Sequence, residues 1–204
     1  MIAEELWKKL EFEGAIRNSR VRKALVKVKR EEYVPLSYRK YAYMDTPLPI
    51  GHDQTISAPH IVALMTSLLK VLPGQKILEV GSGSGYQTAI LLQMLGGKGK
   101  VFSVERLNAL VEMAKQNLLK QEFKNYKILK GDGHNGLNEN KPYDRIIVSA
   151  SAKKIPEKLL KQLKKGGLLI IPVGNELLSV RKDKKGVCSQ KLEEYVNFVP
   201  LVEN

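Results

Sequence analysis

Three alternating glycines follow a short apolar run in the stretch Ile77-Leu78-Glu79-Val80-Gly81-Ser82-Gly83-Ser84-Gly85. The run Lys76–Val80 is short, apolar and bounded by glycines, as is typical of a buried parallel strand. Tyr86–Leu95 follows and is predicted to be a helix. Glycines at such a junction allow a tight turn and let a ligand approach the backbone beside the helix N-terminus. The stretch therefore predicts a strand, a ligand-binding turn and a helix.

A carboxylate stands where such a turn would need one. Glu105 directly follows the next predicted strand, Lys100–Val104, and lies 20 residues after Gly85. An acid at that strand tip can accept hydrogen bonds from the two hydroxyls of a ribose. A glycine triplet alone is a weak signal, but the flanking strand, the helix and Glu105 together favour a cofactor that contains a nucleoside.

The spacing of the loop helps to choose among such cofactors. The loop reads G-x-G-x-G, whereas the dinucleotide fingerprint is G-x-G-x-x-G/A, and Glu79 precedes the first glycine by two residues. A carboxylate would repel a pyrophosphate and attract an ammonium and a sulfonium group. We therefore favour S-adenosylmethionine over NAD. The alternative for Glu79 is a solvated residue at a strand end.

A third signal follows the predicted strand Tyr126–Leu129. Asp132 and Gly133 lie just beyond it, in the sequence Gly131-Asp132-Gly133. The carboxyl ends of parallel strands share one edge of a sheet, and ligands bind there. Asp132 can accept a hydrogen bond from an adenine amino group, while glycine allows the ring to approach. A Gly-Asp-Gly sequence alone is usually a turn.

Strands and helices alternate through the rest of the chain. This pattern predicts an α/β fold, a doubly wound Rossmann-like parallel sheet with helices on both faces. The further predicted elements are the helices Leu107–Lys120 and Pro156–Leu163 and the strands Arg145–Ser149, Leu168–Val173 and Tyr195–Val199. Lys182–Gly186 is predicted to be an exposed turn, compatible with a hairpin.

The first third of the chain is mainly helical in pattern. Asn18–Glu32 predicts a helix with Asn18 or Ser19 as its N-cap, and Tyr38–Gly51 predicts a loop. A second helix is expected to start near Ser57, with Pro59 in its first turn. We expect a single domain over residues 1–204, with an N-terminal helical cap and substrate loop at 1–68 and a cofactor-binding core at 69–204.

Charge and composition limit the functional classes. The 204 residues carry a net charge of +13, and residues 1–50, 51–150 and 151–204 contribute +4, +4 and +5. This even spread favours a lysine-rich, solvated surface over a nucleic-acid footprint. Cys188 is the only cysteine, which excludes an intramolecular disulfide and a cysteine-based zinc cluster and predicts a cytoplasmic setting. No apolar run approaches the roughly 18 residues of a membrane span, and oligomeric state is left open.

Several motifs resemble one family of class I S-adenosylmethionine-dependent methyltransferases, the protein-L-isoaspartate O-methyltransferases. The resemblance extends from about Val21 to Leu201, and the segment Gln54–His60 is the most specific to the family. The matching segments are Val28–Pro35, Ala42–Gly51, Gln54–His60, Tyr143–Ile146, Leu160–Gly167, Ile171–Gly174 and Phe198–Leu201. The sequence departs from the family pattern at His52-Asp53, at Gln87 and at Ser149–Ala152.

The resemblance implies a reaction and a set of residues. The family transfers a methyl group from S-adenosylmethionine to the α-carboxyl of L-isoaspartyl residues, and the ester then closes to a succinimide. By this resemblance Gln54, Thr55, Ile56 and Ser57 line the pocket over the cofactor's methionine end. Ser57 is our candidate catalytic residue, since its hydroxyl can donate to the substrate carboxylate; it could instead cap a helix, or do both. His60 could steer the substrate or simply pack, and packing is slightly favoured.

Two other functions stay open at this point. A tRNA methyltransferase acting on a ring nitrogen would also suit the glycine loop and the positive charge. An exocyclic-amine methyltransferase would need an Asn/Asp-Pro-Pro-aromatic motif where this chain has Ser149–Ala152. A non-catalytic nucleic-acid-binding protein with a methyltransferase fold is a further alternative, which intact Glu79, Glu105, Asp132 and Ser57 disfavour. The expected partners are isoaspartyl proteins and peptides, without nucleic acid, membrane or metal.

Overall fold

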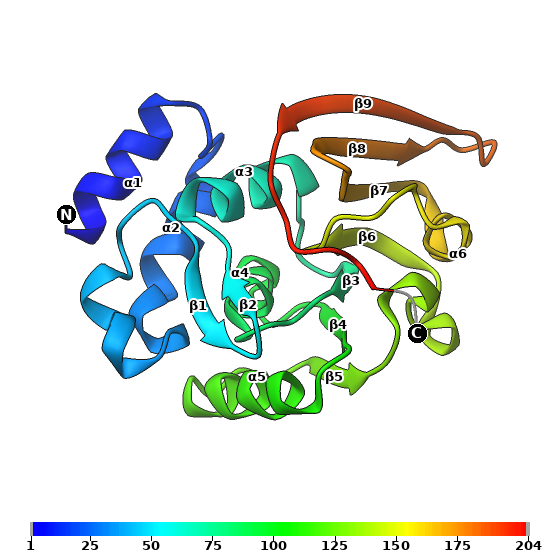
Figure 1. The fold of residues 1–204 in the computed structure, drawn as a ribbon. Helices are drawn as coiled ribbons and strands as arrows, with labels where there is room; N and C mark the ends of the chain where they lie inside the picture. Colours follow the sequence, from blue (N-terminus) through cyan, green and yellow to red (C-terminus); the bar gives the residue numbers. More distant parts are fainter. Residues whose placement is uncertain (1, 203–204) are drawn as a thin grey trace.

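A seven-stranded sheet forms the centre of the computed structural model, which describes residues 2–202 (Figure 1). Its strand order is β5-β4-β3-β6-β7-β8-β9. The strands are β3 (Lys76–Val80), β4 (Lys100–Glu105), β5 (Tyr126–Lys130), β6 (Tyr143–Val148), β7 (Leu163–Val173), β8 (Glu176–Lys182) and β9 (Cys188–Tyr195). Strands β3 to β7 pair in parallel, while β8 is antiparallel to both of its neighbours. The predicted α/β fold is confirmed, but the sheet is parallel only in part.

The order of the strands reverses beside β3. The chain runs outward through β4 and β5, then returns to the other side of β3 with β6. Crossover connections on the two sides of such a point leave a crevice at the carboxyl ends of the central strands. The glycine loop follows β3 and therefore lies at this crevice.

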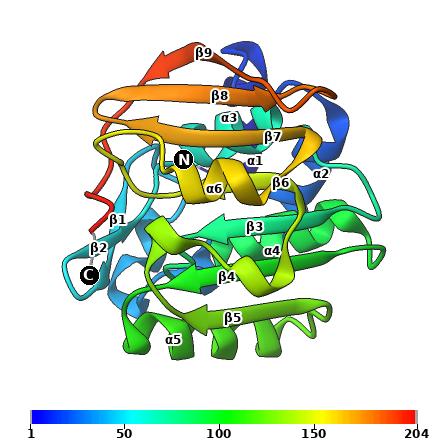
Figure 2. The same ribbon diagram turned by 90° about the vertical axis from the view of Figure 1, so that its right-hand side faces the viewer.

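Helices cover both faces of the sheet. Figure 2 shows α6 in front of one face, with α1 to α4 behind the other. The helices are α1 (Ala3–Phe12), α2 (Ser19–Lys27), α3 (Pro59–Leu69), α4 (Tyr86–Leu95), α5 (Asn108–Lys120) and α6 (Glu157–Gln162). Short 3-10 helices are η1 (Arg30–Tyr33), η2 (Leu36–Tyr41), η3 (Gly133–Asn135) and η4 (Asn138–Asn140). Side chains that alternate along a strand enter two different hydrophobic clusters. In β3, Ile77 belongs to the cluster on the face covered by α1 to α5, and Leu78 belongs to the cluster on the α6 face.

The first third contains more structure than its pattern predicts. Asn18 caps α2 as expected, accepting a hydrogen bond from the Val21 amide at 3.0 Å. The helix ends at Lys27, not at Glu32. The residues that follow turn inward, and Arg30 and Tyr33 are 0% and 2% exposed. Helix α1 precedes it and was not predicted; its Leu6, Trp7 and Leu10 are buried at helical spacing.

The predicted loop Tyr38–Gly51 is wrong at its start, which η2 covers as far as Tyr41, and also at its end. Strands β1 (Leu48–Gly51) and β2 (Gln54–Ile56) form an antiparallel hairpin there. Its two turn residues, His52 and Asp53, have φ of 54° and 56°. Positive φ at both central residues is what a two-residue hairpin turn requires. Pro49 is tolerated because this two-stranded sheet consists of edge strands only.

The C-terminal elements also differ from expectation. Strand β7 begins at Leu163 instead of Leu168, and β9 covers Cys188–Tyr195 instead of Tyr195–Val199. The hairpin at Lys182–Gly186 is confirmed by the antiparallel pairing of β8 with β9. After β9 the chain turns back to the sheet, where the Ser151 amide donates to the Val199 carbonyl at 2.8 Å.

One hydrophobic cluster joins the N-terminal helices to the sheet. It contains Leu6 and Trp7 of α1 together with Ile147 of β6 and Ile170 of β7. The division into a cap at 1–68 and a core at 69–204 stays a prediction. Within residues 2–202, no helix is both long enough and apolar enough to span a bilayer.

Candidate active site

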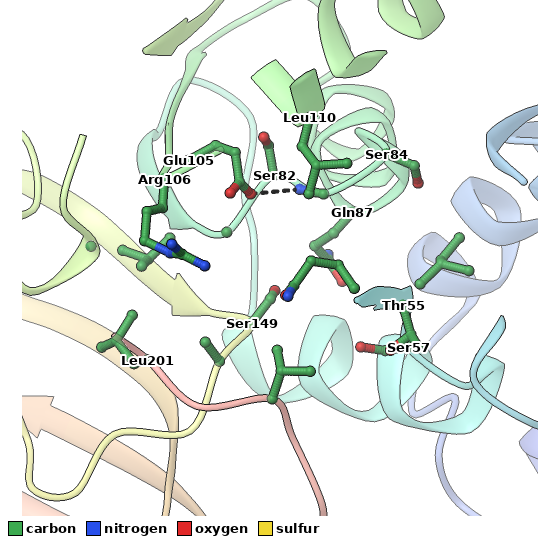
Figure 3. Close-up of a pocket in the computed structure, with 18 of the residues that line it drawn as sticks. Thr55, Ser57, Ser82, Ser84, Gln87, Glu105, Arg106, Leu110, Ser149 and Leu201 are labelled. Carbon is green, nitrogen blue, oxygen red and sulfur yellow. Dashed lines mark hydrogen bonds between the residues drawn. The ribbon is translucent and has the colours of Figure 1, made fainter. Parts of the chain in front are cut away.

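A pocket opens at the carboxyl ends of the central strands (Figure 3). It joins segments that are far apart in the chain: the glycine loop, the end of β4, the β1–β2 hairpin, α3 and the C-terminal segment. Its walls are formed by Asp53–Ser57, Ile61, Val62, Met65, Val80–Ser84, Tyr86, Gln87, Val104–Leu107, Leu110, Gly133, Ser149, Ala150 and Val199–Val202.

The glycine loop presents bare backbone to this pocket. Gly81, Gly83 and Gly85 have φ of 87°, 51° and 86°, in the left-handed region. The Gly81 amide donates to the Val104 carbonyl at 2.8 Å, which ties the loop to β4. The buried Ser82 hydroxyl has no hydrogen-bond partner within residues 2–202. Gly81, Ser82 and Gly83 line the pocket, whereas Gly85 lies beside it at the N-cap of α4.

Gly85 is constrained by packing as well as by φ, which gives a test of stability. A Cβ at Gly85 would lie 3.2 Å from the Cα of Ala114 in α5, whereas one at Gly96, with φ of 58°, would meet nothing within 4 Å. We expect Gly85→Ala to lower the free energy of unfolding by about 1–3 kcal/mol through strain alone, and further through the clash. Gly96→Ala is the matched control, since it carries only the strain. In urea titrations of the two variants, equal losses would contradict this account.

Glu105 stands at the tip of β4 as predicted. It is 8% exposed and borders the pocket. Its Oε2 accepts from the Gly83 amide at 3.1 Å, and its Oε1 accepts from the Leu107 amide at 3.1 Å. The first of these bonds is drawn in Figure 3. Backbone donors thus fix the carboxylate against the glycine loop.

Glu79 lies beneath the loop and not in the pocket wall. It is 0% exposed, so the alternative of a solvated strand-end residue is wrong. Its carboxylate accepts a hydrogen bond from the Thr88 hydroxyl of α4. Burial raises the pKa of Glu79 to about 7, and the hydrogen bond from Thr88 opposes that rise. Contact between Glu79 and a cofactor ammonium stays a prediction. The complete burial of Glu79 does not favour such a contact.

The Asp132-Gly133 pair is divided between two roles. Gly133 lines the pocket, and a Cβ there would lie only 2.5 Å from Cγ1 of Val80. The Asp132 side chain caps η3, because its Oδ1 accepts from the His134 amide at 2.9 Å. Asp132 itself is not part of the pocket lining. Its hydrogen bond to an adenine amino group stays a prediction.

The segment Gln54–Ser57 faces the glycine loop across the pocket. All four of its residues, Gln54, Thr55, Ile56 and Ser57, belong to the lining. Figure 3 shows the Ser57 hydroxyl directed into the pocket, toward Ser149. The N-cap of α3 is Ala58, so the prediction that Ser57 caps this helix is wrong. The Gln54 amide group donates to the Asp53 carbonyl at 3.1 Å, which stiffens the hairpin turn.

The family described as protein-L-isoaspartate(D-aspartate) O-methyltransferase matches residues 1–204. The chain belongs to this family.

Individual relatives agree with that membership. Protein-L-isoaspartate O-methyltransferase of Methanococcoides burtonii is 47% identical over 91% of this chain and 93% of its own length. The Methanopyrus kandleri protein of the same name is 47% identical over 98% of this chain and 90% of its own length. A Plasmodium falciparum protein-L-isoaspartate O-methyltransferase, crystallised with S-adenosyl-L-homocysteine, superposes with a TM-score of 0.86 at 30% identity, covering 99% of both chains.

Within this member of the protein-L-isoaspartate O-methyltransferase family, His60 pairs with Asp45 outside the pocket lining. The ring Nδ1 of His60 lies 2.8 Å from Asp45 Oδ1, which also accepts from the His60 amide at 2.9 Å. The hydrogen bond to Asp45 raises the pKa of His60 above 6.5, although partial burial opposes it. Burial of Asp45 would raise its pKa, but its bonds to His60 outweigh this and leave the pKa low. Direct substrate contact by His60 stays a prediction.

The pair should make stability depend on pH. Because the pKa of His60 is raised, its contribution is full below about pH 6.5 and is lost as pH rises through the folded pKa. The contribution of Asp45, whose pKa is lowered, is lost only in acid, as pH falls through its folded pKa. In NMR titrations, Asp45→Asn should lower the pKa of His60. An unchanged His60 midpoint would rule out the pairing in solution.

Sequence reasoning overlooked several pocket residues. Arg106 follows Glu105 directly and is directed into the pocket in Figure 3, together with Leu110 of α5. Leu201 comes from the C-terminal segment, held by its amide bond to the Ser151 carbonyl at 2.7 Å. The family motif Phe198–Leu201 was the available signal for that segment. Among residues 2–202, no group of three or more His, Cys, Asp or Glu side chains could hold a metal ion.

Proposed function

We propose that this chain transfers a methyl group from S-adenosylmethionine to the α-carboxyl of L-isoaspartyl residues in damaged proteins and peptides. The methyl ester then closes to a succinimide, which reopens in part to normal aspartyl. The observation that carries the proposal is that Gln54–Ser57, the first part of the family-specific segment Gln54–His60, meets the glycine loop and Glu105 in one pocket. Family membership over residues 1–204 supports it.

The residues of the pocket suit S-adenosylmethionine. Glu105 offers carboxylate oxygens for ribose hydroxyls, and its Oε2 is already oriented by the Gly83 amide. The backbone of Gly81–Gly83 offers polar groups at close approach. Gly133 lines the same pocket. When bound, the cofactor supplies an electrophilic methyl group on a sulfonium.

The chain's own contribution is placement. An acceptor carboxylate has a pKa near 4, so it is ionised at neutral pH and needs no general base. The Ser57 hydroxyl donates a hydrogen bond to that carboxylate and fixes its direction of approach. Apolar side chains of α3, Ile61, Val62 and Met65, line the pocket beside it and exclude water. Placement of this kind can be worth roughly 7–11 kcal/mol of the barrier.

The proposal extends to the compartment, the partners and the domain plan. We infer a cytoplasmic location, supported by the single cysteine, Cys188, which is exposed and free. Isoaspartyl proteins and peptides are the proposed partners, and nucleic acid is not expected. Residues 1–68 are the proposed cap that carries the substrate segment, and residues 69–204 the cofactor-binding core.

The chemistry of repair gives a direct test. A synthetic isoaspartyl peptide incubated with the protein and S-adenosylmethionine at neutral pH should convert progressively to its aspartyl isomer. The isomers are separated by reversed-phase chromatography over several hours. Without S-adenosylmethionine the conversion should stop. Conversion at the same rate in both reactions, or in neither, would contradict the proposed activity.

A further inference from the structure

We propose that the side-chain carbonyl of Gln87 binds the α-ammonium group at the amino-acid end of the cofactor. The inference rests on the proposed use of S-adenosylmethionine and adds a residue that the glycine-loop motif does not contain. Gln87 is the second residue of α4 and lines the pocket. Figure 3 shows it between the glycine loop and the segment that carries Thr55 and Ser57.

The Gln87 side chain is anchored to α3 by a hydrogen bond. Its Nε2 donates to the Thr66 hydroxyl of α3 at 3.0 Å, and Thr66 is 0% exposed. The donor half of the amide is therefore engaged at the helix–helix contact. Within residues 2–202 no hydrogen bond uses Oε1, which leaves the acceptor half available to a ligand. A primary ammonium offers three donors and no acceptor, so an amide oxygen is a complementary partner.

The carboxylates near the loop are already committed elsewhere. Glu79 is buried beneath the loop and accepts from Thr88. Glu105 accepts from the Gly83 and Leu107 amides and stands at the ribose end of the site. The amino-acid end of the cofactor adjoins its sulfonium, which must face the methyl acceptor at Ser57. Gln87 lies between the glycine loop and the segment that carries Ser57. Its side-chain oxygen therefore offers the hydrogen-bond acceptor that the buried Glu79 does not present.

A neutral amide also suits the reaction. The pocket must admit a substrate carboxylate beside the sulfonium. A second carboxylate in place of Gln87 would repel that substrate, whereas an amide oxygen supplies a hydrogen-bond acceptor without net charge. The competing explanation is purely architectural, with Gln87 serving only to join α4 to α3 through Thr66. Loss of an architectural contact would weaken every ligand of the pocket alike.

Two ligands separate these explanations. S-adenosylhomocysteine carries the amino-acid end, and 5′-methylthioadenosine lacks it. Titration calorimetry would measure both dissociation constants for wild type, Gln87→Leu and Gln87→Glu. Gln93→Leu is the matched control, since Gln93 lies on the same helix but lines a different groove near Gly96. A hydrogen bond to a charged group is worth enough for Gln87→Leu to weaken S-adenosylhomocysteine about tenfold or more.

The expected pattern is selective. Gln87→Leu should leave the affinity for 5′-methylthioadenosine within about twofold, Gln87→Glu should retain S-adenosylhomocysteine binding, and Gln93→Leu should change neither. Equal losses for both ligands, or no loss for S-adenosylhomocysteine, would overturn the inference. If wild type methylates no isoaspartyl peptide while the selective loss persists, the inference stands and the proposed function fails. If wild type binds neither ligand, both fail.

Discussion

Replacing Glu105 with leucine should weaken the binding of S-adenosylhomocysteine by about 100-fold or more. Two hydrogen bonds from ribose hydroxyls to a carboxylate would be lost, each worth roughly 1.5–3 kcal/mol. The substitution also removes the acceptor that holds the Gly83 and Leu107 amides at 3.1 Å, so the glycine loop loses its support. Titration calorimetry measures the affinity for S-adenosylhomocysteine. Thermal unfolding of the variant shows how much stability is lost when the glycine loop loses its support.

Glu112 provides the control for this substitution. It lies on α5, is exposed, and pairs with Lys115 at 2.9 Å. Glu112→Leu removes the same charge at a distance from the pocket lining, and its effect on affinity should stay within about twofold. A loss below about fivefold for Glu105→Leu would remove this carboxylate from the binding site.

Ser57→Ala should lower kcat by about 100-fold while leaving the Kd for S-adenosylhomocysteine within about threefold. The alanine cannot donate to the acceptor carboxylate, and a misplacement near 1 Å is enough for a loss of this size. The cofactor cradle is unaffected, because the Gly81–Gly83 backbone and Glu105 stay in place. Steady-state kinetics with an isoaspartyl peptide and calorimetry with S-adenosylhomocysteine give the two quantities.

A conservative variant sharpens the interpretation. Ser57→Thr retains the hydroxyl and should recover a substantial part of kcat. Since the N-cap of α3 is Ala58, loss of a helix cap does not explain a defect in Ser57→Ala. Parallel losses of turnover and cofactor affinity would instead give Ser57 a purely structural role.

The glycine-loop side of the pocket could be predicted because its signals are local. The strand before Gly81, the helix after Gly85 and the acid at the next strand tip are adjacent in sequence. The position of Glu79 was also available from strand periodicity. Ile77 and Glu79 share the face opposite to Leu78 and Val80, and that face is covered by α4. A side chain on a covered face is buried, not solvated.

The remainder depends on long-range contacts. The Gln87–Thr66 bond joins two helices, and the C-terminal segment reaches the pocket only because Ser151 pairs with Val199 and Leu201. No local pattern specifies these partners. The β1–β2 hairpin was hidden by its prolines and by His52-Asp53, whose positive φ gives no strong sequence signal without glycine.

The central claim is tested most directly by the identity of the methyl acceptor. Labelled S-adenosylmethionine would be supplied with an isoaspartyl peptide, its normal aspartyl twin, and bulk tRNA in parallel reactions. We predict label on the isoaspartyl peptide alone, released by mild base as expected for a methyl ester. Base-stable label on tRNA, or no label on any of the three, would contradict the account.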